Sequence, residues 1–232
     1  MKGKTVLLVL GSMLCVLLLG LIPGNPLFRA NWALVSFLFL GLVILAFFYG
    51  YELQRPSVKE ISLIATMAAL AAVSRVPFVI IPGLQPMTFL VMITGWVFGV
   101  RQGFAVGAIA ALASNFFLGQ GPWTPWQMFG WGIGGALAAL AGRKTQKFEI
   151  YKFTFLVTFW GYAFGWIMNI WHWIGFIYPL NKETFIAAYA ASFTFDTIHA
   201  FGNLLFALTF GKTFYEILQR YKKKITISAI DP

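Results

Sequence analysis

The chain has 232 residues, of which 59% are hydrophobic and only 10% are charged. Soluble domains carry charge on about a quarter of their residues, so this composition excludes a soluble globular protein and indicates an integral membrane protein. The formal net charge of +10 could indicate nucleic-acid binding, so the positions of the basic residues have to decide that question.

Long apolar runs follow one another along the chain, separated by short polar connections. About 20 apolar residues cross the hydrocarbon core of a bilayer as a helix, and the short alternating segments of a membrane β-barrel are missing. The sequence therefore predicts an all-α fold, a polytopic transmembrane helical bundle. Its eight spans are expected at about residues 5–22, 32–50, 60–81, 86–100, 102–118, 125–142, 152–176 and 187–211.

Two of these predictions concern individual spans. The first span is expected to be a retained anchor rather than a cleaved signal peptide, because no small-residue cleavage site follows it. The fourth and fifth spans are short and flank Arg101 and Gln102, so they are expected to form a tight hairpin.

The basic residues are distributed unevenly between the two sides of this topology. If the N-terminus is inside, all 17 Lys and Arg except Arg29, Arg75 and Lys182 fall on one side. The positive-inside rule then places both termini in the cytoplasm, in the plasma membrane of a bacterium. The positive charge is thus an orientation signal in a lipid bilayer, and no nucleic-acid partner is expected.

The connection between the fifth and sixth spans, GQGPWTPW at residues 119–126, is unusually polar for this chain. Its Gly and Pro residues end one helix, and its Trp residues suit the membrane–water interface on the extracellular side. An aromatic belt does not explain the neighbouring amide and hydroxyl groups of Asn115, Gln120, Thr124 and Gln127. Such groups beside flat indole rings would suit a water-facing pocket for a ligand with several amides or a broad ring.

Further polar side chains are expected at a similar depth. Asp196, His199 and Asn203 are spaced i, i+3 and i+7, which places them on one face of the eighth span. The candidate substrate-binding residues are Arg75, Gln85, Asn115, Gln120, Trp123, Thr124, Trp126, Gln127, Trp131, Asn169, His172, Trp173, Asp196, His199 and Asn203.

Asp196 is the most informative of these residues, because a carboxylate in mid-membrane costs about 2.5–3.5 kcal/mol and should face the bundle interior or a wet cavity. Three roles remain open: a structural pair with His199 or Arg75, a contact with the ligand, or a proton relay. No third metal ligand lies at a suitable spacing from His172 and His199, so no metal site is expected.

No motif predicts catalysis or ATP hydrolysis by this chain. Gly211-Lys212-Thr213 resembles the end of a phosphate-binding loop, but Phe206 stands where that loop requires Gly, and no strand precedes it. No Ser or Cys nucleophile has a plausible partner. The chain is therefore not expected to be an enzyme or to need a cofactor.

Small residues recur at helical spacing on the third, fifth and sixth spans. Such smooth faces let helices approach closely, and internal packing accounts for most of them. The third span carries small residues around much of its circumference, more than one neighbouring helix requires. This excess indicates that a second protein binds there.

Three segments together resemble one known family. The sequences ALAAVSRVPF, SNFFLGQGPWTPWQMF and FDTIHAFGN are similar to those of the S components of energy-coupling-factor (ECF) vitamin importers, most like the cobalamin-specific subunits. The resemblance covers about residues 59–215. It implies a six-helix S-component core at 59–220, preceded by two extra transmembrane helices at 1–58 and followed by a cytoplasmic tail at 221–232.

The resemblance also implies a function. An S component binds a vitamin from outside the cell and docks on a transmembrane coupling subunit that carries two ATPase subunits. The docking face maps onto Ala65, Ala68, Ala69 and Ala72. Cobalamin is the expected cargo, as a transported substrate rather than a cofactor.

Three alternatives remain open. The vitamin could be riboflavin or another heterocycle, which the same amide and indole side chains would suit. The chain could be a stand-alone proton-coupled transporter that uses Asp196, although no inverted repeat is detectable. It could also be a membrane-embedded enzyme that uses His172, Asp196 and His199.

Overall fold

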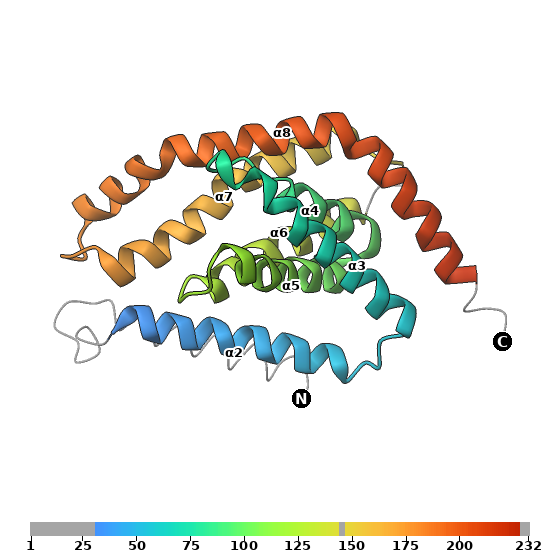
Figure 1. Cartoon of the computed structure of the whole chain (residues 1–232), viewed down its shortest axis with the longest axis horizontal. Coiled ribbons are helices and arrows are strands. Elements are labelled where there is room, and N and C mark those ends of the chain that lie inside the picture. The colour runs from blue at the N-terminus through green and yellow to red at the C-terminus, as the bar shows by residue number, and fades with distance from the viewer. Residues whose placement is uncertain (1–30, 144–146, 228–232) are drawn as a thin grey trace.

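The computed structural model describes residues 31–143 and 147–227, and the predicted span at 5–22 lies outside them. The described residues form helices and connections without a strand, which confirms the all-α bundle (Figure 1). A helix lies at each of the seven predicted spans from 32–50 onward. The elements are α2 (Trp32–Glu52), α3 (Val58–Arg75), the short 3-10 helix η2 (Pro77–Ile80), α4 (Met87–Phe98), α5 (Val100–Leu118), α6 (Thr124–Gly142), α7 (Ile150–Phe176) and α8 (Lys182–Ile227).

Local sequence signals explain where several helices begin and end. The side chains of Asn31 and Ser57 accept hydrogen bonds from the first turns of α2 and α3, as N-cap residues do. Gly99 is the single residue between α4 and α5. Its φ of 121° is a backbone conformation that residues other than glycine rarely adopt. The predicted hairpin of the fourth and fifth spans therefore depends on this glycine.

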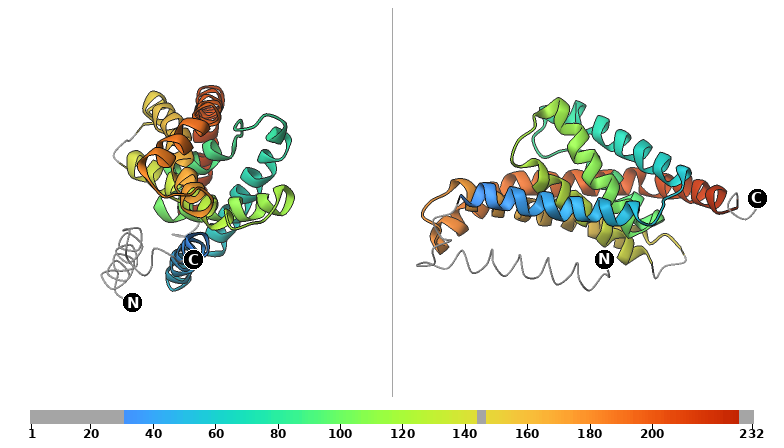
Figure 2. Two further views of the ribbon diagram at one scale, coloured as in Figure 1. Left: turned by 90° about the vertical axis from the view of Figure 1, so that its left-hand side faces the viewer. Right: turned by 90° about the horizontal axis from the view of Figure 1, so that it is seen from below.

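The helices pack around α4, of which every residue from 87 to 97 is buried. Helices α5 and α6 form one closely packed pair and α7 and α8 form another, and α4 contacts both pairs. Helix α2 lies on the outside, chiefly against α6 and α7 (Figures 1 and 2). Helix α8 continues to Ile227, well beyond the predicted end of its span at residue 211.

Glycines allow α4, α5 and α6 to approach one another at backbone distance. A Cβ atom on Gly103 would lie 2.6 Å from the carbonyl oxygen of Gly135 and 2.7 Å from Cα of Gly95. A Cβ atom on Gly107 would lie 2.5 Å from the carbonyl oxygen of Trp131. We call this contact, made by Gly95, Gly103, Gly107 and Gly135, the glycine seam.

The surface of the bundle suits a lipid environment. Among the described residues, three helical segments are long and apolar enough to cross a membrane: Trp32–Glu52, Val58–Ile80 and Ile150–Phe176. Large apolar side chains are exposed over much of the molecule, among them Phe116 at 75% and Phe155 at 73%. Soluble proteins rarely leave so much apolar surface open, so this surface is expected to contact acyl chains.

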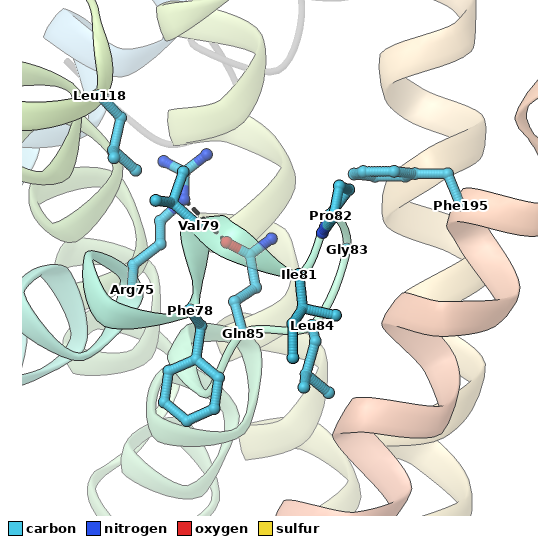
Figure 3. Close-up of a pocket in the computed structure, with 10 residues that line it drawn as sticks. All are labelled: Arg75, Phe78, Val79, Ile81, Pro82, Gly83, Leu84, Gln85, Leu118 and Phe195. Carbon is cyan, nitrogen blue, oxygen red and sulfur yellow. Dashed lines mark hydrogen bonds between the residues drawn. The ribbon is translucent and has the colours of Figure 1, made fainter.

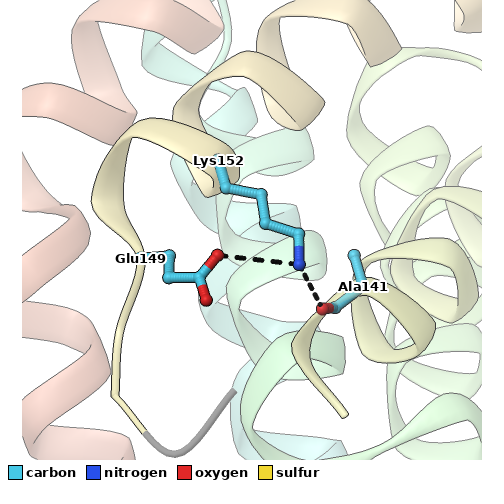
Figure 4. A network of polar contacts seen from close by, with 3 residues as sticks. All are labelled: Ala141, Glu149 and Lys152. Atoms are coloured by element: carbon cyan, nitrogen blue, oxygen red, sulfur yellow. Dashed lines mark hydrogen bonds and ion pairs between the residues drawn. The ribbon is translucent and has the colours of Figure 1, made fainter. Parts of the chain in front are cut away.

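Most of the basic residues gather at one end of the bundle. The end of α2, the start of α3 and the C-terminal part of α8 all lie at the right of Figure 1. At this end Lys222 donates to the carbonyl oxygen of Val97, and Lys152 contacts both Glu149 and the carbonyl oxygen of Ala141 (Figure 4). The side of the membrane that this end faces stays a prediction.

Candidate functional site

A network of polar side chains connects α3, α4, α5 and α6 at the end opposite to the basic residues. Its centre is Arg75, the last residue of α3. The guanidinium donates from Nε to Gln85 (2.7 Å) and from Nη1 to Ser114 (2.9 Å) and Asn115 (3.0 Å). The guanidinium carbon lies 4.9 Å from the ring centroid of Trp131, a cation–π distance. We call these five residues and their direct partners the Arg75 network.

The network continues inward from Trp131 toward α8. The indole Nε1 of Trp131 donates to Thr88 (2.9 Å), and the Thr88 hydroxyl forms a hydrogen bond of 2.8 Å with Nε2 of His199. The ring of Phe164 lies between those of Trp131 and His199. Nδ1 of His199 is buried and has no partner among the described residues. The predicted residues Arg75, Trp131 and His199 are thus joined, through Thr88, into one connected set.

A cavity of about 250 Å³ borders the Arg75 network. It lies between η2 with the following loop on one side and α8 on the other (Figure 3). Its polar lining comes from Arg75 and Gln85, and the rest is apolar. The apolar lining residues are Phe78, Val79, Ile81, Pro82, Gly83, Leu84, Leu118 and Phe195.

Residues 119–127 do not line the cavity beside Arg75. Five of them instead line an open, mostly apolar groove of about 760 Å³ between α2 and the helices α5 and α6: Gln120, Gly121, Pro122, Thr124 and Pro125. A water-facing ligand pocket under this segment stays a prediction. The Asn115 amide donates to Gln127 (2.8 Å) and Thr124 (3.0 Å), and the Thr124 hydroxyl donates to Gln120 (3.0 Å). The polar groups of this segment therefore satisfy one another. The segment acts as a support for Asn115, and the cavity lies on the other side of the network, beside Arg75.

Asp196 belongs to a second, separate cluster between α7 and α8. Asn169 donates to the hydroxyl of Ser192 (2.6 Å), which donates to the Asp196 carboxylate (2.9 Å). Asp196 is only 3% exposed. Of the three roles that the sequence leaves open for Asp196, the structure does not show the pairing with His199 or Arg75, because the carboxylate accepts from Ser192 instead. Ligand contact and a proton relay stay predictions.

Five predicted site residues lie away from both clusters. Trp126 donates to Ser36 of α2, and Trp173 donates to Thr184. The remaining three do not face the cavity either: Trp123 packs against Trp171, His172 is exposed beside Phe176, and Asn203 donates to the carbonyl oxygen of Val157. The structure therefore does not bring these five residues into the candidate site.

Three hydroxyl residues of the two clusters were not predicted from the sequence: Thr88, Ser114 and Ser192. Each is a small polar residue inside a long apolar run, and such residues commonly bond to their own helix backbone. Ser114 does so as well, because its hydroxyl donates to the carbonyl oxygen of Ala111 while accepting from Arg75. The position of Ser114 immediately before Asn115 was the one available signal.

No group of three or more metal-ligating side chains lies close together in the described parts of the chain. His199 and His172, the two histidines of the sequence, sit in different surroundings, one buried in the Arg75 network and one exposed near the end of α7.

The small residues of α3 divide into two faces. Ala65 and Ala69 are exposed on the outer side of the helix. Ala68 and Ala72 are 0% and 2% exposed, because they pack into the bundle. A partner cannot reach those two residues, so the structure contradicts a docking role for Ala68 and Ala72. A docking role for Ala65 and Ala69 stays a prediction.

Comparison with known proteins gives one match. The family model described as "ECF-type riboflavin transporter, S component" matches residues 55–222. The match covers α3 to α7 and most of α8, including every helix of the Arg75 network, and leaves α2 outside. No curated protein and no solved structure matches the chain.

Proposed function

The chain belongs to the family of ECF-type riboflavin transporter S components, and from this premise we propose that it captures a vitamin at the Arg75 network and hands it to an ECF coupling module. Members of this family are transport subunits, which agrees with the absence of catalytic motifs from the sequence. The observation that carries the proposal is the extent of the match, which includes α3 to α7 and most of α8.

The substrate we propose first is a flavin. The family description names riboflavin, and cobalamin, expected from the sequence segments, is the second candidate. The cavity beside Arg75 measures about 250 Å³, below the range of about 300–1,000 Å³ that is usual for ligand pockets. A flavin requires a moderate enlargement of this cavity, whereas cobalamin, which is several times larger, requires rearrangement of the surrounding helices.

The loop after α3 is the element that would move to admit the ligand. Val79, Ile80 and Ile81 are 58%, 84% and 49% exposed, so they contribute little packing that would hold the loop in place. The same loop lines the cavity through Val79, Ile81 and Pro82. Displacing it would open the cavity while leaving α4 and the glycine seam unchanged.

Inside the cavity the ligand would meet donors, acceptors and an aromatic face. Arg75 and Gln85 supply the polar groups of the cavity lining, and Phe78 and Phe195 supply its aromatic rings. Trp131, which is buried, packs against the Arg75 guanidinium. Behind them, the Asn115 side chain is fixed by donating one hydrogen bond to Gln127 and accepting one from Arg75. Groups fixed in this way bind a ligand with little further loss of conformational entropy.

Release of a tightly bound vitamin requires energy from partners. The proposed partners are a transmembrane coupling subunit and two ATPase subunits, and the proposed contact is the outer face of α3 with Ala65 and Ala69. Small exposed residues let another helix approach α3 closely. Because Arg75 is the last residue of the same helix, tilting α3 would displace the centre of the network.

Calorimetry on the purified chain in lipid nanodiscs tests the proposal. We expect saturable binding of riboflavin, with weaker binding of cobalamin and biotin. Arg101→Gln serves as a control, because Arg101 is exposed at the opposite end of the bundle. Binding of cobalamin in place of riboflavin would change the substrate, and binding of no vitamin would contradict the proposal.

Transport in liposomes distinguishes an S component from a stand-alone carrier. We expect ATP-dependent uptake only when the coupling subunit and the ATPases are present. Concentrative uptake driven by a pH gradient in their absence would instead favour the proton-coupled transporter with Asp196.

A further inference from the structure

The charge of Arg75 is not compensated by any described carboxylate. Its three hydrogen-bond acceptors are the neutral side chains of Gln85, Ser114 and Asn115. Within residues 31–143 and 147–227 the one ion pair joins Lys152 to Glu149, at the basic end of the bundle. The buried carboxylate of Asp196 accepts from Ser192 and packs against Gly165 of α7. Arg75 is therefore a cation surrounded by neutral groups.

The guanidinium also has unused hydrogen-bonding capacity. The bonds to its three acceptors come from Nε and Nη1, and Nη2 has no hydrogen-bond partner in the described part of the chain. Arg75 lines the cavity together with Gln85, and the other lining residues are apolar (Figure 3). The guanidinium, whose Nη2 has no partner, thus borders a cavity that no other charged residue lines.

A cation held in surroundings of low dielectric favours an anion strongly. Electrostatic attraction strengthens as water is excluded, and a guanidinium matches the oxygen spacing of phosphate and carboxylate groups. Hydrogen bonds between ionised partners are roughly twice as strong as those between neutral ones. A neutral vitamin would leave the charge of Arg75 uncompensated in the bound state.

We propose that the ligand of this site carries an oxyanion, a phosphate ester or a carboxylate, which binds Nη2 of Arg75 inside the cavity. The inference rests on the proposed function and makes it more specific. Arg75 then selects among vitamins and their derivatives by charge, while Gln85, Ser114 and Asn115 hold its guanidinium in place.

Paired ligands that differ only in the anionic group test this inference. Riboflavin 5′-phosphate is compared with riboflavin, and biotin with biotin amide, by calorimetry on the full chain in nanodiscs. We expect the anionic member of one pair to bind about 10- to 100-fold more tightly, the range for a charge-assisted hydrogen bond. The pair that shows the preference identifies the phosphate or the carboxylate as the recognised group.

Two variants assign the preference to Arg75. Arg75→Gln should abolish the preference, because the anionic ligand loses a charge-assisted bond and its affinity therefore falls about 10- to 100-fold more than that of the neutral ligand. Gln85→Glu keeps the cation but places a carboxylate beside Nε, which should reduce the preference by a similar factor. This second variant carries the test if Arg75→Gln fails to fold. Arg101→Gln is the matched control and should retain the full preference.

The possible failures are distinguishable. Equal affinity within both pairs, or an equal loss for both members in Arg75→Gln, overturns the inference and leaves the vitamin-binding function intact. Binding of none of the four ligands, and of no cobalamin, by the folded wild-type chain overturns the proposed function and, with it, the inference.

Discussion

Two sets of small residues lie on neighbouring helices of the bundle, and the structure places them in opposite surroundings. The glycine seam brings α4, α5 and α6 to backbone contact, so that side chains are excluded from it. The outer face of α3 presents Ala65 and Ala69 to the surroundings of the protein. Gly103 and Gly107 of the seam are four residues apart on one helix, as are Ala65 and Ala69. The comparison teaches that small residues at helical spacing indicate close approach without indicating which partner approaches.

The largest effect is expected inside the seam, from Gly135→Leu. A Cβ atom on Gly135 would already lie 2.5 Å from the carbonyl carbon of Gly103, and backbone cannot give way as a flexible side chain can. We expect a destabilisation of at least about 3 kcal/mol, the upper range for overpacking, and therefore little folded protein. Fluorescence-detected size-exclusion chromatography and thermal unfolding measure the outcome.

Gly41→Leu is the matched control for this prediction. Gly41 lies in α2, and a Cβ atom there would meet nothing within 4 Å. The same substitution should therefore be tolerated, with an effect within about 0.5 kcal/mol. If Gly135→Leu folds as well as Gly41→Leu, the backbone contact of the seam is not required.

The next effect is expected on the outer face of α3. Ala69→Trp should abolish docking on the coupling subunit, because the indole fills the space that a partner helix needs, while vitamin binding stays within about 3-fold of wild type. Pull-down of the coupling subunit and calorimetry measure the two properties separately. Ala68→Trp, one residue away and buried, should instead prevent folding. Docking by a folded Ala69→Trp variant would place the interface elsewhere.

The sequence predicted the helices well because their signals are local. Apolar length, Asn and Ser caps, and Gly and Pro breaks act within a few residues, and each predicted span within the described residues corresponds to a helix. The end of α8 was missed because charged residues such as Lys222 can continue a helix beyond the membrane. Its extension depends on contacts such as that of Lys222 with Val97, which are distant in sequence.

The site was predicted only in part, because it depends on rotation of helices around their axes. The sequence identified Arg75, Asn115 and Trp131, which the structure joins into one network. It grouped them with Trp126 and Trp173, which could also bind a ligand. The indole groups of these two residues instead donate to Ser36 of α2 and to Thr184 near the start of α8. Composition shows which side chains can bind a ligand, and only the packing of the helices shows which of them face the same space.

A moderate effect is expected from Asn115→Ala. Asn115 lies in α5, the helix that also carries Gly103 and Gly107 of the glycine seam. Asn115 accepts from Arg75 and donates to Thr124 and Gln127, so the change leaves three partners short of a hydrogen bond. We expect a loss of about 1–3 kcal/mol in stability and a reduced vitamin affinity, because the guanidinium loses one of its supports. Thermal unfolding and calorimetry on the same sample measure both.

Gln120→Ala is the control for Asn115→Ala. Gln120 is exposed and contacts Thr124 without contacting Arg75, so its loss should leave vitamin affinity unchanged. Equal losses of affinity in the two variants would show that residues 119–127 contact the ligand directly.

The smallest effect is expected where α2 meets the docking helix, from Tyr51→Phe. The Tyr51 hydroxyl donates to Glu60 of α3 (2.8 Å), and Glu60 also accepts from Gln102 of α5 (2.6 Å). Because Gln102 still holds the carboxylate after the change, we expect a loss of about 0.5–1 kcal/mol with docking unchanged. Gln102→Ala together with Tyr51→Phe should cost more than the sum of the single changes, since Glu60 is then left without either donor. Loss of docking in Tyr51→Phe alone would show that α2, which lies outside the family match, sets the position of the exposed face of α3.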